Sequence, residues 1–166
     1  MFTDLVVKNE NEELIRKLAK ELGLNLIFLE KKKDKYVSKT PEIILTKAVR
    51  SNIENRQLKY HFGAEYLEEK DAMHHRRSGF NQVLMKLMKE KEKTLVIAME
   101  PLIEHEDKPL IIGRIAQNLK LARKYSVPVI ICSLAQKPES LRGKQELKSF
   151  IKTLGFEEIA KKAFLE

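Results

Sequence analysis

Two adjacent arginines that directly precede a helical pattern are the residues of this chain best suited to chemistry with phosphate. Residues 74–93 read HHRRSGFNQVLMKLMKEKEK, and Arg76 and Arg77 stand before Ser78, where the pattern predicts that a helix begins. A helix N-terminus attracts anions through its unpaired N–H groups and the positive end of its dipole. Guanidinium groups add paired hydrogen bonds to phosphate oxygens. The segment predicts a phosphate-binding site, although a solvated helix with a polar leading loop explains the same residues.

The predicted helix has one apolar face and one basic face. From Phe80 onwards, apolar residues recur at i, i+3, i+4, i+7 and i+8, which is the spacing of a helix that packs on a core. The other face carries Gln82, Lys86, Lys89 and Lys93. This basic stripe would extend a phosphate-binding surface away from the two arginines.

A second loop of the same type occurs later in the sequence. In ESLRGKQEL, residues 139–147, Arg142 and Lys144 lie in a loop directly before a predicted helix. They predict a second phosphate contact at a helix start. A capping loop with solvated charges is the alternative interpretation.

The histidines do not have the spacing of a metal site. His74 and His75 are adjacent, so their side chains point apart on a strand or a helix. The first predicted strand, DLVVK, has no His-x-His pair, and the sequence has no CxxC, HExxH or GxSxG motif. Glu100 follows a predicted strand and could act as an acid or base, but we interpret it as a loop carboxylate that balances the basic surface. We therefore predict no catalytic residue and no metal ligand.

The composition indicates one globular domain, residues 1–166, with unevenly distributed charge. The chain is 43% hydrophobic and has a formal net charge of +8. It contains no apolar run near the ~20 residues that a membrane-spanning helix needs, and its N-terminus lacks a signal-peptide layout, so we expect a soluble, intracellular protein. Residues 108–152 contain ten Lys or Arg and two acidic residues. Segregated basic charge of this kind is typical of nucleic-acid binding.

Short apolar runs alternate with helical patterns along the chain. Runs without alternation are typical of parallel strands that are buried on both faces. Between the last two runs, residues 110–125 predict a helix with Arg114 on its outward face. The βα order predicts an α/β protein, and the chain is shorter than the ~200 residues that eight full βα units need. The runs that predict strands are residues 5–7, 26–29, 43–45, 95–99 and 129–132.

Three further segments connect these elements. The basic sequence KKKDK, residues 31–35, predicts a loop. Residues 52–58 predict a helix, and residues 64–67 predict one more short strand. After the last strand, residues 143–154 and 156–164 predict two helices.

Several of these segments together resemble one family. The elements RRSGFNQVL, LARKY followed by PV, and LR-x-x-x-EL, taken as a set over roughly residues 52–156, resemble the ribonuclease P protein component 3 family. This family is the archaeal counterpart of the eukaryotic thirty-kilodalton subunit. The resemblance implies an incomplete or distorted TIM-type (β/α) barrel with mostly parallel strands. Such a barrel is related to polymerase-and-histidinol-phosphatase-like phosphoesterases but lacks their metal ligands. The chain would be a shortened member, because residues 46–73 are too few for all the βα units of the family.

The resemblance also implies a function. The chain would be a non-catalytic subunit of ribonuclease P, which removes the 5′ leader from precursor tRNA. The catalytic centre would belong to the RNA and use Mg²⁺, and the chain itself would bind no cofactor. Its partners would be ribonuclease P RNA, a small ferredoxin-like protein subunit and, indirectly, precursor tRNA. The alternatives are a metal-dependent phosphoesterase of the same barrel superfamily and a scaffold whose basic face meets an acidic protein.

The residues expected to contact RNA combine the two loops and the basic stripe. Arg, Lys, Asn and Gln side chains suit RNA helices, which proteins recognise mostly through shape, phosphates and 2′-hydroxyls. The predicted RNA contacts are Arg76, Arg77, Ser78, Asn81, Gln82, Lys86, Lys89, Arg142 and Lys144.

Overall fold

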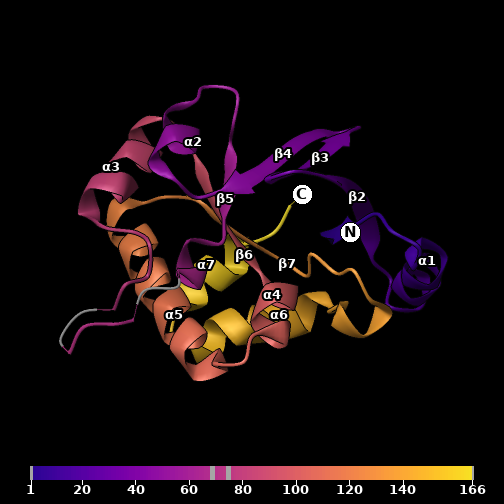
Figure 1. The fold of residues 1–166 in the computed structure, drawn as a ribbon. Helices are drawn as coiled ribbons and strands as arrows, with labels where there is room; N and C mark the ends of the chain where they lie inside the picture. The colour runs from indigo at the N-terminus through magenta and orange to yellow at the C-terminus, as the bar shows by residue number, and fades with distance from the viewer. Residues whose placement is uncertain (1, 68–69, 74–75, 166) are drawn as a thin grey trace.

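Seven strands follow one another around a nearly closed, mostly parallel barrel, and helices pack around it (Figure 1). The computed structural model describes residues 2–67, 70–73 and 76–165. Strands that are neighbours in the sequence are also neighbours in the sheet. The strands are β1 (Thr3–Val7), β2 (Asn25–Lys32), β3 (Lys35–Lys39), β4 (Glu42–Lys47), β5 (Tyr60–Phe62), β6 (Thr94–Ala98) and β7 (Val129–Cys132).

The barrel closes between β1 and the segment that follows β7. The Val7 N–H donates to the Ala135 carbonyl at 2.9 Å, and the Leu134 N–H donates to the Leu5 carbonyl at 2.8 Å. Four of the strand pairs are parallel, and β3 alone among the described strands runs in the opposite direction. The predicted fold, an incomplete barrel of mostly parallel strands, is therefore confirmed.

The antiparallel strand β3 lies where the sequence predicts only a loop. Lys31 and Lys32 belong to β2, Lys35 begins β3, and two residues form the turn between them. The loop prediction for residues 31–35 was wrong because this hairpin tip is exposed. Its side chains need not be apolar, so the strand pairing leaves no hydrophobic pattern.

Most helices lie on helical patterns of the sequence, but the helix that begins at Met99 was not predicted, because this residue was assigned to the preceding strand. Among the described residues, no helix is both long and apolar enough to cross a membrane. The helices are α1 (Glu12–Glu21), α2 (Arg50–Glu54), α3 (Gln82–Glu90), α4 (Met99–Glu104), α5 (Lys108–Tyr125), α6 (Lys144–Thr153) and α7 (Glu157–Lys162), with short 3₁₀ helices η1 (Ala64–Tyr66) and η2 (Pro138–Ser140).

The region before α3 differs from the prediction. The predicted helix over residues 52–58 is the shorter α2, and the predicted strand over residues 64–67 is the 3₁₀ helix η1. The actual strand, β5, has three residues and pairs in parallel with both β4 and β6. Pairing on both sides supports this short strand, although it has no apolar run of its own.

Both faces of the central strands are buried, which explains why their sequences do not alternate. In β6, Leu95 and Ile97 pack in the core that contains residues of α3, α5, α6 and α7. The intervening Val96 and Ala98 pack inside the barrel with residues of β1, β2, β4 and β7. Each strand therefore contributes to two cores, as expected for a parallel sheet that is covered on both sides.

A carboxyl group without a hydrogen-bond partner is buried next to the carboxyl end of β5. Glu65, in η1, is fully buried, and neither of its carboxylate oxygens has a hydrogen-bond partner among the described residues. Burial raises the pKa of Glu65 from 4.5 to about 7, because the ionised form is disfavoured where it cannot be solvated.

This burial predicts a pH-dependent effect of Glu65→Gln. Between about pH 4.5 and 7 the folded protein binds more protons at Glu65 than the unfolded chain does, so this residue lowers stability as the pH rises. The amide does not titrate. The free energy of unfolding of the variant, relative to wild type, should therefore increase by roughly 2–3 kcal/mol between pH 5 and pH 8 in urea titrations. Glu13→Gln, at an exposed position of α1, is the control for the loss of a carboxylate. A pH trend for Glu65→Gln no larger than that of this control would contradict the buried carboxyl.

Candidate nucleic-acid interface

The loop that carries Arg76 and Arg77 is held against one face of α5. The side-chain amide of Gln117 donates to the Arg76 carbonyl at 3.1 Å. The side-chain amide of the next residue, Asn118, donates to the Ser78 carbonyl at 2.9 Å. These bonds hold the backbone of an irregular segment while the arginine side chains remain exposed.

Arg114 is the central residue of this attachment. Its fully buried side chain donates through Nη1 to the carbonyls of Glu65 and Leu67, at 3.0 and 2.8 Å. Its Nε and Nη2 lie 3.0 and 2.9 Å from one carboxylate oxygen of Asp71. The prediction that Arg114 faces outward was wrong, because the loop covers this part of α5 and satisfies the guanidinium.

Asp71 connects Arg114 to the basic loop. The same carboxylate oxygen accepts a hydrogen bond from the Arg77 N–H at 2.9 Å. Partial burial opposes ionisation of Asp71, but the hydrogen bonds from Arg77 and Arg114 outweigh this effect and hold its pKa below the usual value. Asp71 therefore stays ionised and fixes the backbone directly before the exposed arginines.

The guanidinium of Arg76 rests on a glycine of α5. A Cβ atom added at Gly113 would overlap Nη1 of Arg76. The missing side chain at Gly113 thus leaves room for the guanidinium along the helix. Arg76 is positioned from two sides, by its carbonyl bond to Gln117 and by this packing.

The structure corrects the predicted start of α3. The helix begins at Gln82, and the side chain of Asn81 caps it by accepting a hydrogen bond from the Leu84 N–H at 2.9 Å. Ser78 lies four residues earlier and is only 1% exposed. The prediction that Ser78 begins the helix was wrong because Gly79, with a φ of 80°, turns the chain tightly against η1. The buried side chain of Ser78 offers no surface for RNA.

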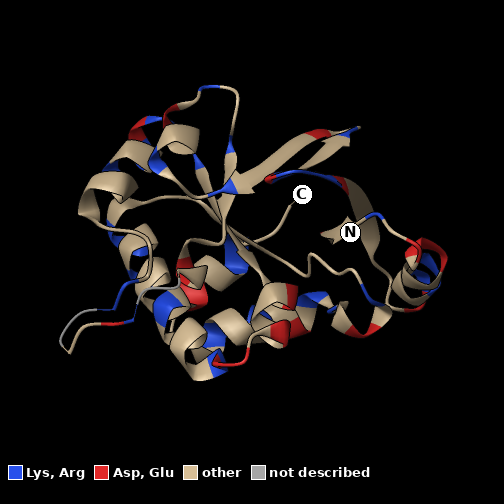
Figure 2. Cartoon of the chain, viewed as in Figure 1, with Lys and Arg blue, Asp and Glu red and all other residues tan. Residues whose placement is uncertain are grey.

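The basic stripe of α3 is partly confirmed. Lys86 and Lys89 are exposed, and Gln82 is exposed with its carbonyl oxygen accepting the Tyr125 hydroxyl at 3.1 Å. Lys93 is 2% exposed and donates to two carbonyls of the segment before β5. Its assignment to the exposed stripe was wrong, because α3 ends before it and the chain turns inward to β6. Figure 2 shows the basic residues that remain along α3 and the loop before it.

The second predicted contact has a different local structure. The Arg142 guanidinium donates to the Glu139 and Leu141 carbonyls, at 2.5 and 2.8 Å. The Glu146 carboxylate accepts a hydrogen bond from the Gly143 N–H at 2.7 Å, so the start of α6 already has an anion. Lys144 lies over an aromatic ring of the C-terminal segment. In Figure 1, the segment between β7 and α6 lies on the opposite side of the molecule from the loop before α3.

The other titratable candidates support the fold. Glu100 is buried, and its carboxylate accepts a hydrogen bond from the Gln136 N–H; burial raises its pKa. Glu100 thus holds the segment after β7. The interpretation of Glu100 as a loop carboxylate that balances the basic surface was wrong, because the residue is buried in the first turn of α4. His61 is buried between Thr46 and the Leu58 carbonyl, and burial lowers its pKa to about 4.

Metal binding finds no support in the described part of the chain. Within residues 2–67, 70–73 and 76–165, no group of three His, Cys, Asp or Glu residues is arranged to hold a metal ion. His74 and His75 lie outside the described residues.

Asp71, Gln117 and Asn118 are the positioning residues that sequence reasoning missed. Asp71 gives no signal, because an acidic residue in a loop is common. Arg114 and Asn118 do give one, since they lie four residues apart on the face of α5 that also buries Ile111 and Ile115. Polar residues in an apolar stripe need buried partners, and here the partners are in the adjacent loop.

The attachment predicts that Arg114→Leu destabilises the protein. Removing the guanidinium takes away the donor for the Glu65 and Leu67 carbonyls and leaves Asp71 without its ion pair to Arg114. The free energy of unfolding should fall by about 3–5 kcal/mol. Amide hydrogen exchange at residues 76–80 should accelerate. Lys120→Leu, at an exposed position of the same helix, should change stability by less than about 0.5 kcal/mol; equal losses in the two variants would refute the attachment.

Comparisons with known proteins give a consistent picture. No family model matches the chain. The sequence is similar to two proteins called ribonuclease P protein component 3. The protein of Methanosarcina mazei is 37% identical over 83 residues, which are 49% of this chain and 35% of the relative. The protein of Methanosarcina acetivorans is 35% identical over 85 residues, which are 50% of this chain and 36% of the relative. The matches thus span about a third of the length of each relative.

The fold is similar to that of a solved structure over nearly the whole chain. A chain in the cryo-EM structure of archaeal ribonuclease P with mature tRNA aligns with a TM-score of 0.68 and 18% sequence identity. The alignment covers 98% of this chain and 78% of that chain. The resemblance that the motifs predict is therefore confirmed over half of the sequence, and the barrel is confirmed over nearly all of it.

Proposed function

We propose that this chain is a non-catalytic, RNA-binding subunit of ribonuclease P. In this role it supports the catalytic RNA in the removal of the 5′ leader from precursor tRNA. The observation that carries the proposal is the similarity to ribonuclease P protein component 3 over half of the chain. The similar fold of a chain in archaeal ribonuclease P is consistent with it.

The geometry of the basic loop supports contact with RNA. Arg76 and Arg77 are exposed, and the backbone on either side of them is tied to α5 and Asp71. A preorganised guanidinium pair loses little conformational entropy on binding phosphate. The proposed surface comprises Arg76, Arg77, Asn81, Gln82, Lys86 and Lys89.

The partners belong to the same proposal. The chain would bind ribonuclease P RNA directly and precursor tRNA indirectly, together with a small ferredoxin-like protein subunit, in the cytoplasm. Mg²⁺ would act at the catalytic centre of the RNA, with no cofactor on this chain. Arg142 and Lys144 would add a separate contact with RNA, away from α3.

The proposal predicts salt-dependent binding that depends on the two arginines. Each cation that neutralises a phosphate releases counterions, so affinity falls as salt rises. Titration of the chain onto ribonuclease P RNA, with and without the ferredoxin-like subunit, should give a steep negative slope of log K against log salt. Replacing both arginines, Arg76→Ala with Arg77→Ala, should flatten this slope by about 2.

The matched control removes two positive charges elsewhere. Lys17→Ala with Lys20→Ala changes exposed lysines of α1, which lies far from the loop in Figure 1. This variant should keep the wild-type slope. If both double variants change the slope equally, binding reflects only total charge. If the wild type shows no salt-dependent binding to the RNA, either with or without the ferredoxin-like subunit, the proposed function is wrong.

Gly113→Ala tests the positioning of Arg76 without removing a charge. The added methyl group displaces the guanidinium, whereas alanine favours a helix over glycine by about 1 kcal/mol. Affinity for ribonuclease P RNA should fall severalfold while thermal stability is kept. In an Arg76→Ala background, Gly113→Ala should have no further effect on affinity. A loss of equal size in both backgrounds would show that the substitution acts through the helix.

A further inference from the structure

A second concentration of positive charge lies at the amino-terminal edge of the sheet, where α3 leads into β6. It surrounds a pocket of about 590 Å³. The cations come from three parts of the chain: the turn before β5, the last turn of α3 and the approach to β6. We call it the basic pocket; its lining residues are Arg56, Lys59, Lys89, Lys91, Glu92, Lys93, Thr94 and Pro128.

The charges of the basic pocket are far from balanced. Five cations and one carboxylate, Glu92, line it. In the described part of the chain, Arg56, Lys59 and Lys89 form no ion pair with a carboxylate. Lys91 forms a long one, with 4.0 Å between its ammonium and the Glu90 carboxylate. Like charges held around one hollow repel each other, so the arrangement favours an anion inside it.

The pocket is built on a fixed internal support. The Lys93 ammonium donates to the Asn55 and Leu58 carbonyls, at 2.7 Å each. These bonds tie the turn that carries Arg56 and Lys59 to the start of β6. The cations therefore project from a braced segment.

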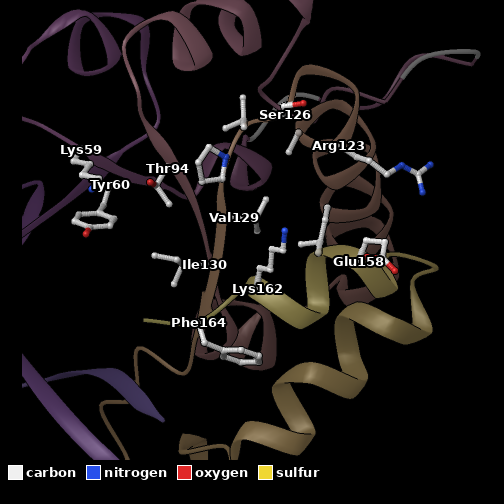
Figure 3. Close-up of a pocket in the computed structure, with 14 residues that line it drawn as sticks. Lys59, Tyr60, Thr94, Arg123, Ser126, Val129, Ile130, Glu158, Lys162 and Phe164 are labelled. Atoms are coloured by element: carbon white, nitrogen blue, oxygen red, sulfur yellow. The ribbon is translucent and has the colours of Figure 1, made fainter. Parts of the chain in front are cut away.

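An adjoining cleft has a different lining from that of the basic pocket. This cleft, of about 610 Å³, shares Lys59, Thr94 and Pro128 with the basic pocket. Figure 3 shows the Lys162 side chain directed into it and the Arg123 guanidinium directed away. The rest of the lining is largely apolar, and it includes a carboxylate on α7. Positive charge is thus concentrated on the side of Lys59 that faces α3.

The helix α3 joins the basic pocket to the basic loop. Lys89 belongs to both the exposed stripe of α3 and the lining of the pocket. Nine helical residues span about 13 Å. Phosphates follow one another at regular intervals along a nucleic-acid backbone. A single backbone segment of a few nucleotides would therefore reach from the start of α3 to the pocket.

We propose that the basic pocket binds backbone phosphates of the same RNA strand that contacts the Arg76–Arg77 loop, so that α3 lies along the strand. This inference rests on the proposed function, and it adds Arg56, Lys59 and Lys91 to the RNA-contacting residues. RNA fits better than an acidic protein segment, because its charges repeat regularly over the distance between the two sites.

The test removes two charges from the basic pocket. Lys59→Gln with Lys91→Gln keeps most of each aliphatic stem, and binding to ribonuclease P RNA is measured across salt concentrations. The slope of log K against log salt should flatten by about 2, as in the Arg76→Ala, Arg77→Ala variant, and the effects of the two double variants should add. The α1 variant Lys17→Ala, Lys20→Ala should bind as wild type does.

The outcomes separate this inference from the proposed function. If wild type binds the RNA and the arginine variant is impaired, but the pocket variant matches the α1 control, the inference is wrong and the function stands. If wild type does not bind, both fail. If poly-glutamate binds wild type as tightly as the RNA does and is equally sensitive to the pocket variant, the pocket recognises carboxylates and the inference is wrong.

A gain of affinity provides a second test that unfolding cannot mimic. Glu92, the single carboxylate of the pocket, has a φ of 52° at the end of α3, where glycine is the favoured residue. Glu92→Gly should therefore preserve the fold and strengthen RNA binding severalfold, with a steeper salt slope. Glu13→Gln, which removes an exposed carboxylate from α1, should not strengthen binding. Unchanged or weaker binding of Glu92→Gly would overturn the proposal.

Discussion

The buried guanidinium of Arg114 is the interaction on which the geometry of the interface depends. The described residues between η1 and α3 belong to no helix and to no strand of the sheet, so bonds from other elements must fix their conformation. Arg114 provides them by binding two carbonyls of the segment after β5 and the carboxylate of Asp71. A buried charge is costly unless its hydrogen bonds are satisfied, so the loop and the guanidinium stabilise each other. The contacts between Arg114 and the loop thus fix the backbone that carries Arg76 and Arg77.

Much of the fold could be predicted because its strands are buried on both sides. The runs around Leu95 and Val129 are continuous and apolar for that reason, and the helix of residues 110–125 repeats its apolar residues with helical spacing. Strands β3 and β5 escaped prediction for different reasons. The exposed tip of the hairpin at β3 has no hydrophobic pattern, and β5 is too short to show one. Strand β3 depends on hydrogen bonds with β2 and β4, which adjoin it in the sequence, and β5 depends on hydrogen bonds with β4 and β6.

The sequence predicts correctly which residues of the interface are exposed when their charge is simply solvated. It fails where a charged side chain has hydrogen-bond partners inside the protein. Arg76, Arg77, Lys86 and Lys89 are exposed, as their charge suggests. Lys93 looks the same in sequence, yet it is buried because two carbonyls before β5 accept its hydrogen bonds. Charge alone cannot distinguish these cases, since the deciding groups lie far away along the chain.

The closure of the barrel has a consequence for how the chain is made. Strand β1 completes its hydrogen bonds only with residues that follow β7, and Asp4 bonds with Ser133, 129 residues away. At typical synthesis rates of 5–20 residues per second, the first strand waits on the order of 10 s for this partner. During that interval one edge of β1 is open to pairing with other chains. Strand β1 thus leaves the ribosome before the other described strands of the barrel and is among the last of them to be fully paired.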